Sequence, residues 1–300
     1  MDGAFKVLTQ SFAIGILVLL AAIFIVLWVQ SEPSIHKFGL GFLTSTAWNP
    51  PKENFGALSA IVGTLMSTAV ALVIAIPLSI GIALFLVEIA PDFLRTPLAV
   101  AIELLAAIPS IVYGMWGMFV LPPLMSSYVQ PWLQKYLGFL PLFKGAPLGI
   151  GILTAGIVLA LMVIPFISSV TREVFRMVPQ TLKEAAYGVG CTTWEVVRNV
   201  MIPYGRKGIA GAIFLGLGRA LGETMAVTFV IGNSHNLSLS LFAMGNSIAS
   251  TLANEFTEAD TAIYMSSLIE LGLVLFLITF IILGLAQWWL QRSQSSGSLR

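Results

Sequence analysis

Charged residues are scarce in this sequence, and cysteine and histidine are nearly absent. Asp, Glu, Lys and Arg make up 10% of the 300 residues, whereas a soluble domain typically contains about 25%. The single cysteine, Cys191, excludes a disulfide within the chain. The two histidines, His36 and His235, lie far apart and do not provide the spacing of a zinc site. A net charge of +1 gives no general attraction to nucleic acid.

Long hydrophobic runs are what the sequence has instead. Hydrophobic residues make up 57% of the chain, in runs of about 20 residues or more, which is the length needed to cross a bilayer as a helix. The runs do not alternate with the period of two that barrel strands show. We therefore predict an all-α, polytopic membrane protein with six transmembrane helices, at residues 11–29, 58–88, 97–122, 148–170, 208–232 and 262–290.

The distribution of Lys and Arg predicts the orientation. With the N-terminus inside, ten basic residues fall in cytoplasmic segments and four in outer loops, and such an excess marks the cytoplasmic side. Both termini are therefore expected in the cytoplasm. The longest cytoplasmic segment is then the loop at 171–207, and the tail at 291–300 is expected to be disordered.

The loop at 171–207 carries signals for two short helices. Thr181 with Glu184, and Thr192 with Glu195, each have the spacing of a capping box. A glycine such as Gly190, between the two, can adopt the positive φ that ends a helix. We therefore expect two helices around a glycine turn.

One spacing within this loop has a known counterpart. The residues are Glu184, Ala185 and Ala186, then Gly190 four positions on, and Val200, Ile202 and Pro203 at the end. The pattern resembles the EAA loop of bacterial ABC importer permeases, EAA-x3-G-x9-I-x-L-P, with Val and Ile as conservative departures. In that family the loop docks on a separate ATPase subunit. The resemblance thus implies ATPase coupling for Glu184, Ala185, Ala186 and Gly190. The alternative, a loop packed only on its own membrane domain, would suffice for the letters EAA alone.

Four further segments narrow the resemblance. They are FLTSTAWNP at 42–50, FGALSAIVGTL at 55–65, ELLAAIPSIVYGMWG at 103–117 and GLGRALGETMAV at 216–227. These are similar to phosphate ABC importer permeases, and the first segment and the MAV ending favour the PstC-type subunit. The resemblance implies a type I ABC importer permease (MetI-like) fold in a bacterial inner membrane. It also implies four partners: a homologous PstA-type permease, a PstB-type ATPase dimer, a periplasmic PstS-type binding protein, and phosphate.

The chain is not expected to be an enzyme or to hold a cofactor itself. A P-loop needs Gly-Lys-Ser/Thr, and none of the seven lysines follows a glycine or precedes Ser or Thr. ATP and Mg would therefore belong to the partner ATPase. The predicted division is a cytoplasmic N-terminus at 1–10, a first helix and periplasmic loop at 11–56, a permease domain at 57–290, and a cytoplasmic tail at 291–300.

Arg219 and Glu223 are the main candidates for the substrate path. Arg219 is the only basic residue inside a predicted span. A guanidinium presents a planar fork of donors that matches phosphate oxygens. If the span is one helix, Glu223 lies one turn on and within pairing distance. We predict that Glu223 holds Arg219 until phosphate competes for it. A purely structural ion pair between helices is the alternative.

Glu103 and Ser110 are the other candidates for the path. Glu103 lies within the third predicted span, and Pro109 should free a backbone carbonyl that Ser110 can help to satisfy. The role of Glu270, in the last span, stays open. An ion-coupled secondary transporter, with a proton relay through Glu103, Arg219 and Glu223, is the alternative function. A membrane enzyme would need a catalytic cluster near an interface, and the sequence offers none.

Overall fold

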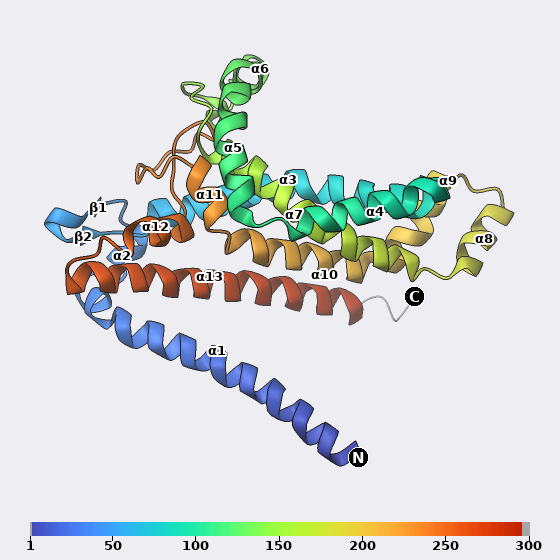
Figure 1. The fold of residues 1–300 in the computed structure, drawn as a ribbon, viewed down its shortest axis with the longest axis horizontal. Coiled ribbons are helices and arrows are strands. Elements are labelled where there is room, and N and C mark those ends of the chain that lie inside the picture. The colour runs from blue at the N-terminus through green and yellow to red at the C-terminus, as the bar shows by residue number, and fades with distance from the viewer. Residues whose placement is uncertain (1, 296–300) are drawn as a thin grey trace.

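The computed structural model describes residues 2–295, and helices dominate them. The long helices are α1 (Asp2–Phe38), α3 (Leu58–Leu84), α7 (Ile152–Arg176), α10 (Ile202–Leu221) and α13 (Ala262–Ser295). Helices α3, α4 (Asp92–Ala107), α7, α10 and α13 run lengthwise beside one another, and α5 (Ser110–Leu124) stands across them (Figure 1). The predicted all-α class is thus confirmed.

Shorter elements connect the long helices. They are α2 (Gly41–Thr44), β1 (Trp48–Asn49), η1 (Pro50–Lys52), β2 (Asn54–Phe55), η2 (Phe85–Ile89), η3 (Met125–Val129), α6 (Gln130–Leu137), η4 (Pro141–Phe143), α8 (Gln180–Gly188), α9 (Thr193–Val196), η5 (Val197–Met201), α11 (Met225–Val230) and α12 (Ile248–Glu255). Strands β1 and β2 form a small antiparallel pair in which Trp48 lies opposite Phe55. Elements η2, η3 and η5 are π-helical turns that extend or join α-helices.

The two ends of the bundle are built differently. Helices α8 and α9 lie at the same end as the start of α1 and the end of α13, whereas β1, β2, α2 and α12 lie at the other (Figure 1). This arrangement agrees with the expectation that the termini and the loop at 171–207 share one side of the membrane. Which side that is stays a prediction.

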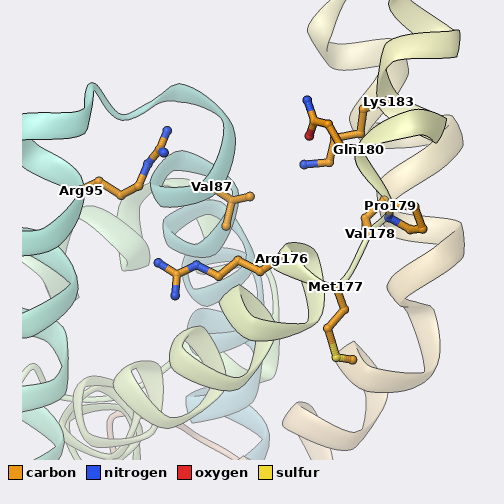
Figure 2. Close-up of a pocket in the computed structure, with 8 residues that line it drawn as sticks. All are labelled: Val87, Arg95, Arg176, Met177, Val178, Pro179, Gln180 and Lys183. Carbon is orange, nitrogen blue, oxygen red and sulfur yellow. The ribbon is translucent and has the colours of Figure 1, made fainter.

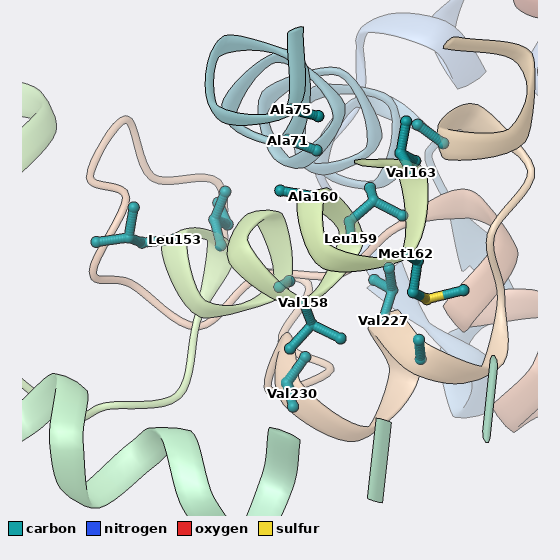
Figure 3. Close-up of a cluster of buried hydrophobic side chains, with 14 of the residues drawn as sticks. Ala71, Ala75, Leu153, Val158, Leu159, Ala160, Met162, Val163, Val227 and Val230 are labelled. Carbon is teal, nitrogen blue, oxygen red and sulfur yellow. The ribbon is translucent and has the colours of Figure 1, made fainter. Parts of the chain in front are cut away.

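The core lies where α3 crosses α7. Ala71 and Ala75 of α3 are fully buried beside Ala160 of α7, and Val158, on another side of α7, is buried near Val230 of α11 (Figure 3). Small side chains allow helix backbones to approach closely within a membrane. At Gly156 the approach is closest, because a Cβ there would lie 2.5 Å from a methyl of Val70.

The prediction of six continuous spans is not confirmed. Four helices are long and apolar enough to cross a membrane, and a fifth span results if α4 and the helix that follows it are counted as one bent unit. The predicted span 97–122 breaks after Ala107 with a bend of 92°. The predicted span 208–232 breaks between α10 and α11. Helix α10 has the length of a span, but its 20 residues include Arg206, Lys207 and Arg219.

Helix α1 is longer than the predicted span 11–29, and it leans away from the bundle. It touches α13 along its later half, where Phe24 meets Phe276 at 5.9 Å between ring centroids. The hydroxyls of Ser34 and Ser267 are 3.1 Å apart in the same interface. Glu270 is buried in α13 beside this contact. Helix α13 includes the first five residues of the predicted tail, and residues 296–300 lie outside the described residues.

A hydrogen-bonded cluster around Glu255 joins four segments at the end that carries β1. Glu255 accepts from the indole of Trp48 at 2.5 Å and from the hydroxyl of Tyr264 at 2.7 Å. His235 Nε2 lies 2.9 Å from the same carboxylate. Because Asn246 donates to His235 Nδ1, Nε2 is the nitrogen that donates to Glu255. Burial opposes ionisation, but hydrogen bonds from His235, Tyr264 and Trp48 outweigh it and lower the pKa of Glu255.

The lowered pKa of Glu255 predicts an acid-sensitive contribution to stability. A carboxyl whose pKa falls on folding stabilises the protein fully above its unfolded value, near 4.5, and loses that effect as pH falls through the folded value. We expect Glu255→Gln to lower thermal stability in detergent at pH 7. The difference from the native chain should shrink as pH falls below about 4.5. A constant difference over this range would contradict the assignment.

Candidate functional site

Arg219 and Glu223 do not share a helix. Helix α10 ends at Leu221 with Gly222 as its C-cap, and α11 begins at Met225. Glu223 therefore sits in the break, where Oε1 accepts from the backbone N–H of Ala226 at 3.4 Å. The ion pairs among residues 2–295 do not include one between Arg219 and Glu223. The expected pairing one turn apart is thus wrong, because α10 ends at Leu221, before Glu223 is reached.

Arg219 stacks on an aromatic ring instead. Its Cζ atom lies 4.2 Å from the ring centroid of Phe166 in α7. A guanidinium stacked on a ring keeps the N–H groups at its edge free to donate. The Nε atom is buried and has no hydrogen-bond partner in the described part of the chain. The charge also acts on the hydroxyl of Tyr113 in α5.

The break between α4 and α5 forms the opposite side of this region. Helix α4 ends at Ala107, and α5 begins at Ser110 with Pro109 as its N-cap. The Tyr113 hydroxyl donates to the Leu105 carbonyl at 2.9 Å. This carbonyl, in the last turn of α4, otherwise accepts only a long bond of 3.4 Å from the Ile108 N–H. We expected Ser110 to donate to a carbonyl at the break, but its hydroxyl makes no hydrogen bond to any residue in 2–295. Ser110 is instead the first residue of the half-helix α5.

The two broken helices pack directly against each other. A Cβ on Gly114 of α5 would lie 2.8 Å from the Ala226 Cα of α11 and 2.8 Å from the ring of Phe229. Only glycine permits this approach without displacement of a neighbour. The helix breaks, Arg219, Tyr113 and Phe166 therefore gather into one region within the bundle, which we call the Arg219 site.

The structure places Glu103 in a different network. Its Oε1 accepts from Arg172 Nη2 at 2.7 Å, and Arg172 also lies 3.1 Å from Glu173. This contact joins α4 to the end of α7. Glu103 is therefore paired within the chain, and its expected place in the substrate path stays a prediction. The proposed proton relay through Glu103, Arg219 and Glu223 does not form, because these residues do not contact one another in 2–295.

Two residues of the Arg219 site were missed by the sequence analysis. Phe166 lies 53 positions before Arg219 in another helix, and no local pattern connects them. Tyr113 lies in the segment ELLAAIPSIVYGMWG, four residues after Pro109. A tyrosine at that distance could have been recognised as a donor for a carbonyl freed by the break.

The loop between α7 and α10 has the predicted form of two helices around a glycine turn. Gly190, with φ of +90°, lies between α8 and α9. The capping box of Thr192 and Glu195 is confirmed, with both reciprocal hydrogen bonds present. The same hydrogen bonds, from the backbone and hydroxyl of Thr192, lower the pKa of Glu195. The predicted box at Thr181 is wrong because the N-cap of α8 is Pro179, two residues before Thr181.

The outer face of this loop is accessible and partly apolar. Glu184, Ala185 and Gly190 are exposed, and Ala186 is half-buried. Nearby apolar side chains are also exposed, with Val189 at 82% and Trp194 at 64%. Exposed aromatic and apolar residues in one place are typical of an interaction surface.

An ion pair fixes this loop to the bundle. Lys183 of α8 contacts Glu88 of η2, and the two side chains are only 9% and 12% exposed. Removing one partner from a buried pair leaves an uncompensated charge.

We therefore expect Lys183→Met to lower the free energy of unfolding by about 3–5 kcal/mol, measured by thermal denaturation in detergent. The double variant Glu88→Gln/Lys183→Met should recover much of this loss. Lys37→Met is the matched control, because Lys37 and Glu53 form an exposed pair that is worth about 1 kcal/mol or less. Equal losses for Lys183→Met and Lys37→Met would contradict the assignment.

The described residues contain no group of three or more His, Cys, Asp or Glu side chains that could hold a metal ion.

Comparison with known proteins places the chain in a family. A family model described as binding-protein-dependent transport system inner membrane component matches residues 75–294. The phosphate transport system permease protein PstC of Mesorhizobium japonicum is 54% identical over 295 residues, which cover 97% of this chain and 90% of that protein. PstC of Haemophilus influenzae is 53% identical, over 99% of this chain and 95% of that protein.

Solved structures agree on the fold. A bacterial alginate ABC transporter, in complex with a periplasmic protein bound to an alginate pentasaccharide, matches with a TM-score of 0.61 at 15% identity. The match covers 93% of this chain and 92% of that one. The MetNI methionine ABC transporter, in an inward-facing conformation, matches with a TM-score of 0.50 at 17% identity, over 80% of this chain and 94% of that one. The chain thus belongs to the family of binding-protein-dependent transport system inner membrane components, in its PstC-type branch.

Proposed function

We propose that the chain is a permease subunit of an ATP-driven phosphate importer and forms half of its translocation path. The observation that carries this is Arg219, a half-buried guanidinium within the bundle with no acid paired to it among residues 2–295. The relatives that match nearly the full chain are named as phosphate transport permeases. The charge, planar shape and in-plane donors of a guanidinium suit phosphate oxygens.

The two helix breaks add to the site. Transporters commonly bind substrates where broken helices leave backbone groups free, and the N-terminus of a half-helix favours an anion. Helix α5 begins at Ser110 with no side-chain cap. We propose that the path passes this N-terminus and Arg219, where phosphate would exchange water for N–H donors.

The residue that holds the Arg219 side chain in place is Phe166, rather than Glu223 as we expected from the sequence. By stacking on the guanidinium, it fixes the plane of Arg219 without neutralising its charge. Glu223 caps α11 and remains close enough in sequence to influence the path when the break changes conformation. An anion site that lacks a second cation binds weakly, and weak binding suits a path that the substrate must leave.

In this proposal the α8–α9 loop couples the permease to ATP hydrolysis by a separate subunit. Glu184, Ala185, Ala186 and Gly190 would form the surface that docks on a separate ATPase, which binds ATP and Mg. The loop is fixed to η2 by the buried pair of Lys183 and Glu88 and leads through η5 directly into α10. A displacement of the loop would therefore move α10, and with it the Arg219 side chain that α10 carries.

The remaining partners follow from the same proposal. They are a PstA-type permease that completes the path, a PstB-type ATPase dimer, and a PstS-type protein that delivers phosphate at the end carrying β1 and α12. The complex would lie in the bacterial inner membrane, with both termini of this chain in the cytoplasm and six crossings if α4–α5 and α10–α11 each count as one. Nothing in the described structure favours an ion-coupled transporter.

Uptake in proteoliposomes tests the proposed function. The chain is reconstituted with the three partners, and radiolabelled phosphate uptake is followed with and without ATP and with a proton uncoupler. We expect uptake to require ATP and to persist with the uncoupler. Uptake that survives without ATP but collapses with the uncoupler would overturn the proposal in favour of ion coupling.

A further inference from the structure

A basic pocket opens where α8 meets the ends of η2, α4 and α7. Figure 2 shows Arg95 and Arg176 on one side of it and Gln180 and Lys183 on the other. The pocket has a volume of about 440 Å³. Its lining is Val87, Arg95, Arg176, Met177, Val178, Pro179, Gln180 and Lys183. The described lining includes three cationic side chains, of which Lys183 is already paired with Glu88. Arg95 and Arg176 are therefore the side chains that suit a phosphate group here.

The two arginines are only weakly engaged elsewhere. Arg95 lies 3.2 Å from Asp92, and Arg176 lies 3.1 Å from Glu173, in pairs that solvent reaches. Exposed ion pairs of this kind contribute about 0–1 kcal/mol. The Nε atom of Arg95 is buried and has no hydrogen-bond partner within residues 2–295. Arg95 Nη2 also donates to the Ala90 carbonyl at 3.1 Å, so the anion would be bound by the remaining N–H groups of the two guanidiniums.

The N-terminus of α8 opens on the same pocket. Pro179 is its N-cap and provides no side-chain hydrogen bond, and the first turn holds no acid. Pro179 and Gln180 both line the pocket. An uncapped helix N-terminus adds free N–H donors and the positive end of the helix dipole. The N-terminus of α8 thus attracts an anion, as the positive charges of Arg95 and Arg176 do.

A separate apolar groove is lined by residues of α3, η2 and α4 that are close in sequence to those of the pocket. It has a volume of about 450 Å³. Its lining is Pro77, Leu78, Gly81, Ile82, Phe85, Leu86, Leu98 and Ile102. Leu98 lies one turn along α4 from Arg95, and Leu86 directly precedes Val87 of the pocket. Helix α4 runs from the end that carries α8 toward the middle of the bundle (Figure 1), so the groove lies farther toward membrane depth than the pocket.

We propose that the basic pocket and the apolar groove together bind one membrane phospholipid. The phosphate group lies between Arg95 and Arg176 at the N-terminus of α8, and an acyl chain lies in the groove beside Leu98. Basic pockets between transmembrane helices bind anionic head groups in this way. Free phosphate shares the head-group chemistry but offers nothing to the groove. A bound lipid would brace α8 against η2 and α4, independently of what the permease transports.

Native mass spectrometry of the detergent-purified importer complex tests this. The probe is phosphatidylglycerol, added before delipidating washes. We expect the native complex to retain it and Arg95→Gln/Arg176→Gln to retain about a hundredfold less, because two charge-assisted hydrogen bonds, each worth about a factor of ten, are lost. Arg198→Gln is the control, since Arg198 is an exposed base outside the pocket. Equal retention by the double variant and the native complex would overturn the proposal.

A second variant tests the groove without touching the charges. A Cβ at Gly81 would meet nothing within 4 Å, so Gly81→Leu fills the groove without strain on the helix. We expect it to reduce phosphatidylglycerol retention while heat stability without lipid stays unchanged. If inorganic phosphate instead stabilises the lipid-free complex through Arg95 and Arg176, and Gly81→Leu has no effect, the ligand is a free anion and the lipid assignment fails.

Discussion

Replacing Arg219 with Gln is expected to lower ATP-driven phosphate uptake about ten- to a hundredfold in the reconstituted complex. Hydrogen bonds to a charged partner are worth about 1.5–3 kcal/mol each, and 1.4 kcal/mol corresponds to a factor of ten. Arg219→Lys keeps the charge but loses the planar fork and the stacking on Phe166. It should therefore recover only part of the activity. Radiolabelled uptake at matched protein incorporation measures both variants.

The control for Arg219 comes from the same helix. Arg206 also lies in α10 but is exposed, and Arg206→Gln removes the same charge. We expect its uptake to stay within about twofold of the native complex, since exposed charges contribute little. If Arg219→Gln and Arg206→Gln transport equally well, Arg219 is not part of the path. A fall in both ATPase assembly and uptake in Arg219→Gln would instead show a structural role.

Replacing Ala185 with Trp is expected to separate the ATPase from the permease. Ala185 is an exposed small residue in α8, so a bulky side chain there leaves the interior of this chain unchanged but prevents close approach of a partner. A central interface residue typically contributes 2 kcal/mol or more, which is at least about a thirtyfold loss of affinity. Co-purification of the ATPase with the tagged permease, and phosphate-dependent ATP hydrolysis, should both fall.

Ala146→Trp provides the comparison for this substitution. Ala146 is also exposed, but it lies in the connection between α6 and α7, far in sequence from the α8–α9 loop. The same change in volume there should leave ATPase co-purification unchanged. Normal co-purification by Ala185→Trp would contradict the coupling assignment, and loss in both variants would indicate a general defect in assembly.

Much of the architecture follows from local patterns. Hydrophobic length predicted the all-α membrane class and the positions of α1, α3, α7 and α13. The Thr192–Glu195 box predicted the start of α9, and the glycine at Gly190 predicted the turn before it. Each of these features depends on residues within one or two helical turns, where the sequence carries direct information.

The sequence predictions that were wrong concern helix breaks and contacts between residues far apart in the chain. Membrane helices often contain glycine and proline, so Gly222 did not by itself reveal that α10 ends there. The break removed the expected pairing of Arg219 with Glu223. Glu103 pairs with Arg172, which lies 69 positions away in the chain. The packing of α4 on α7 brings the two residues together, and the periodicity of the sequence does not predict that packing. The site could therefore be located near Arg219 from sequence, but its partners could not.

Cysteine accessibility tests the central claim, that the path passes the two helix breaks, most directly. Single cysteines at Ser110 and Thr224, in a Cys191→Ser background within the full complex, are exposed to a water-soluble thiol reagent with and without phosphate. Ile16→Cys is the control, because Ile16 lies on the outer surface of α1. The account predicts labelling at both breaks that phosphate slows, and no labelling at Ile16. Breaks that resist the reagent, or that react at the same rate with and without phosphate, would contradict it.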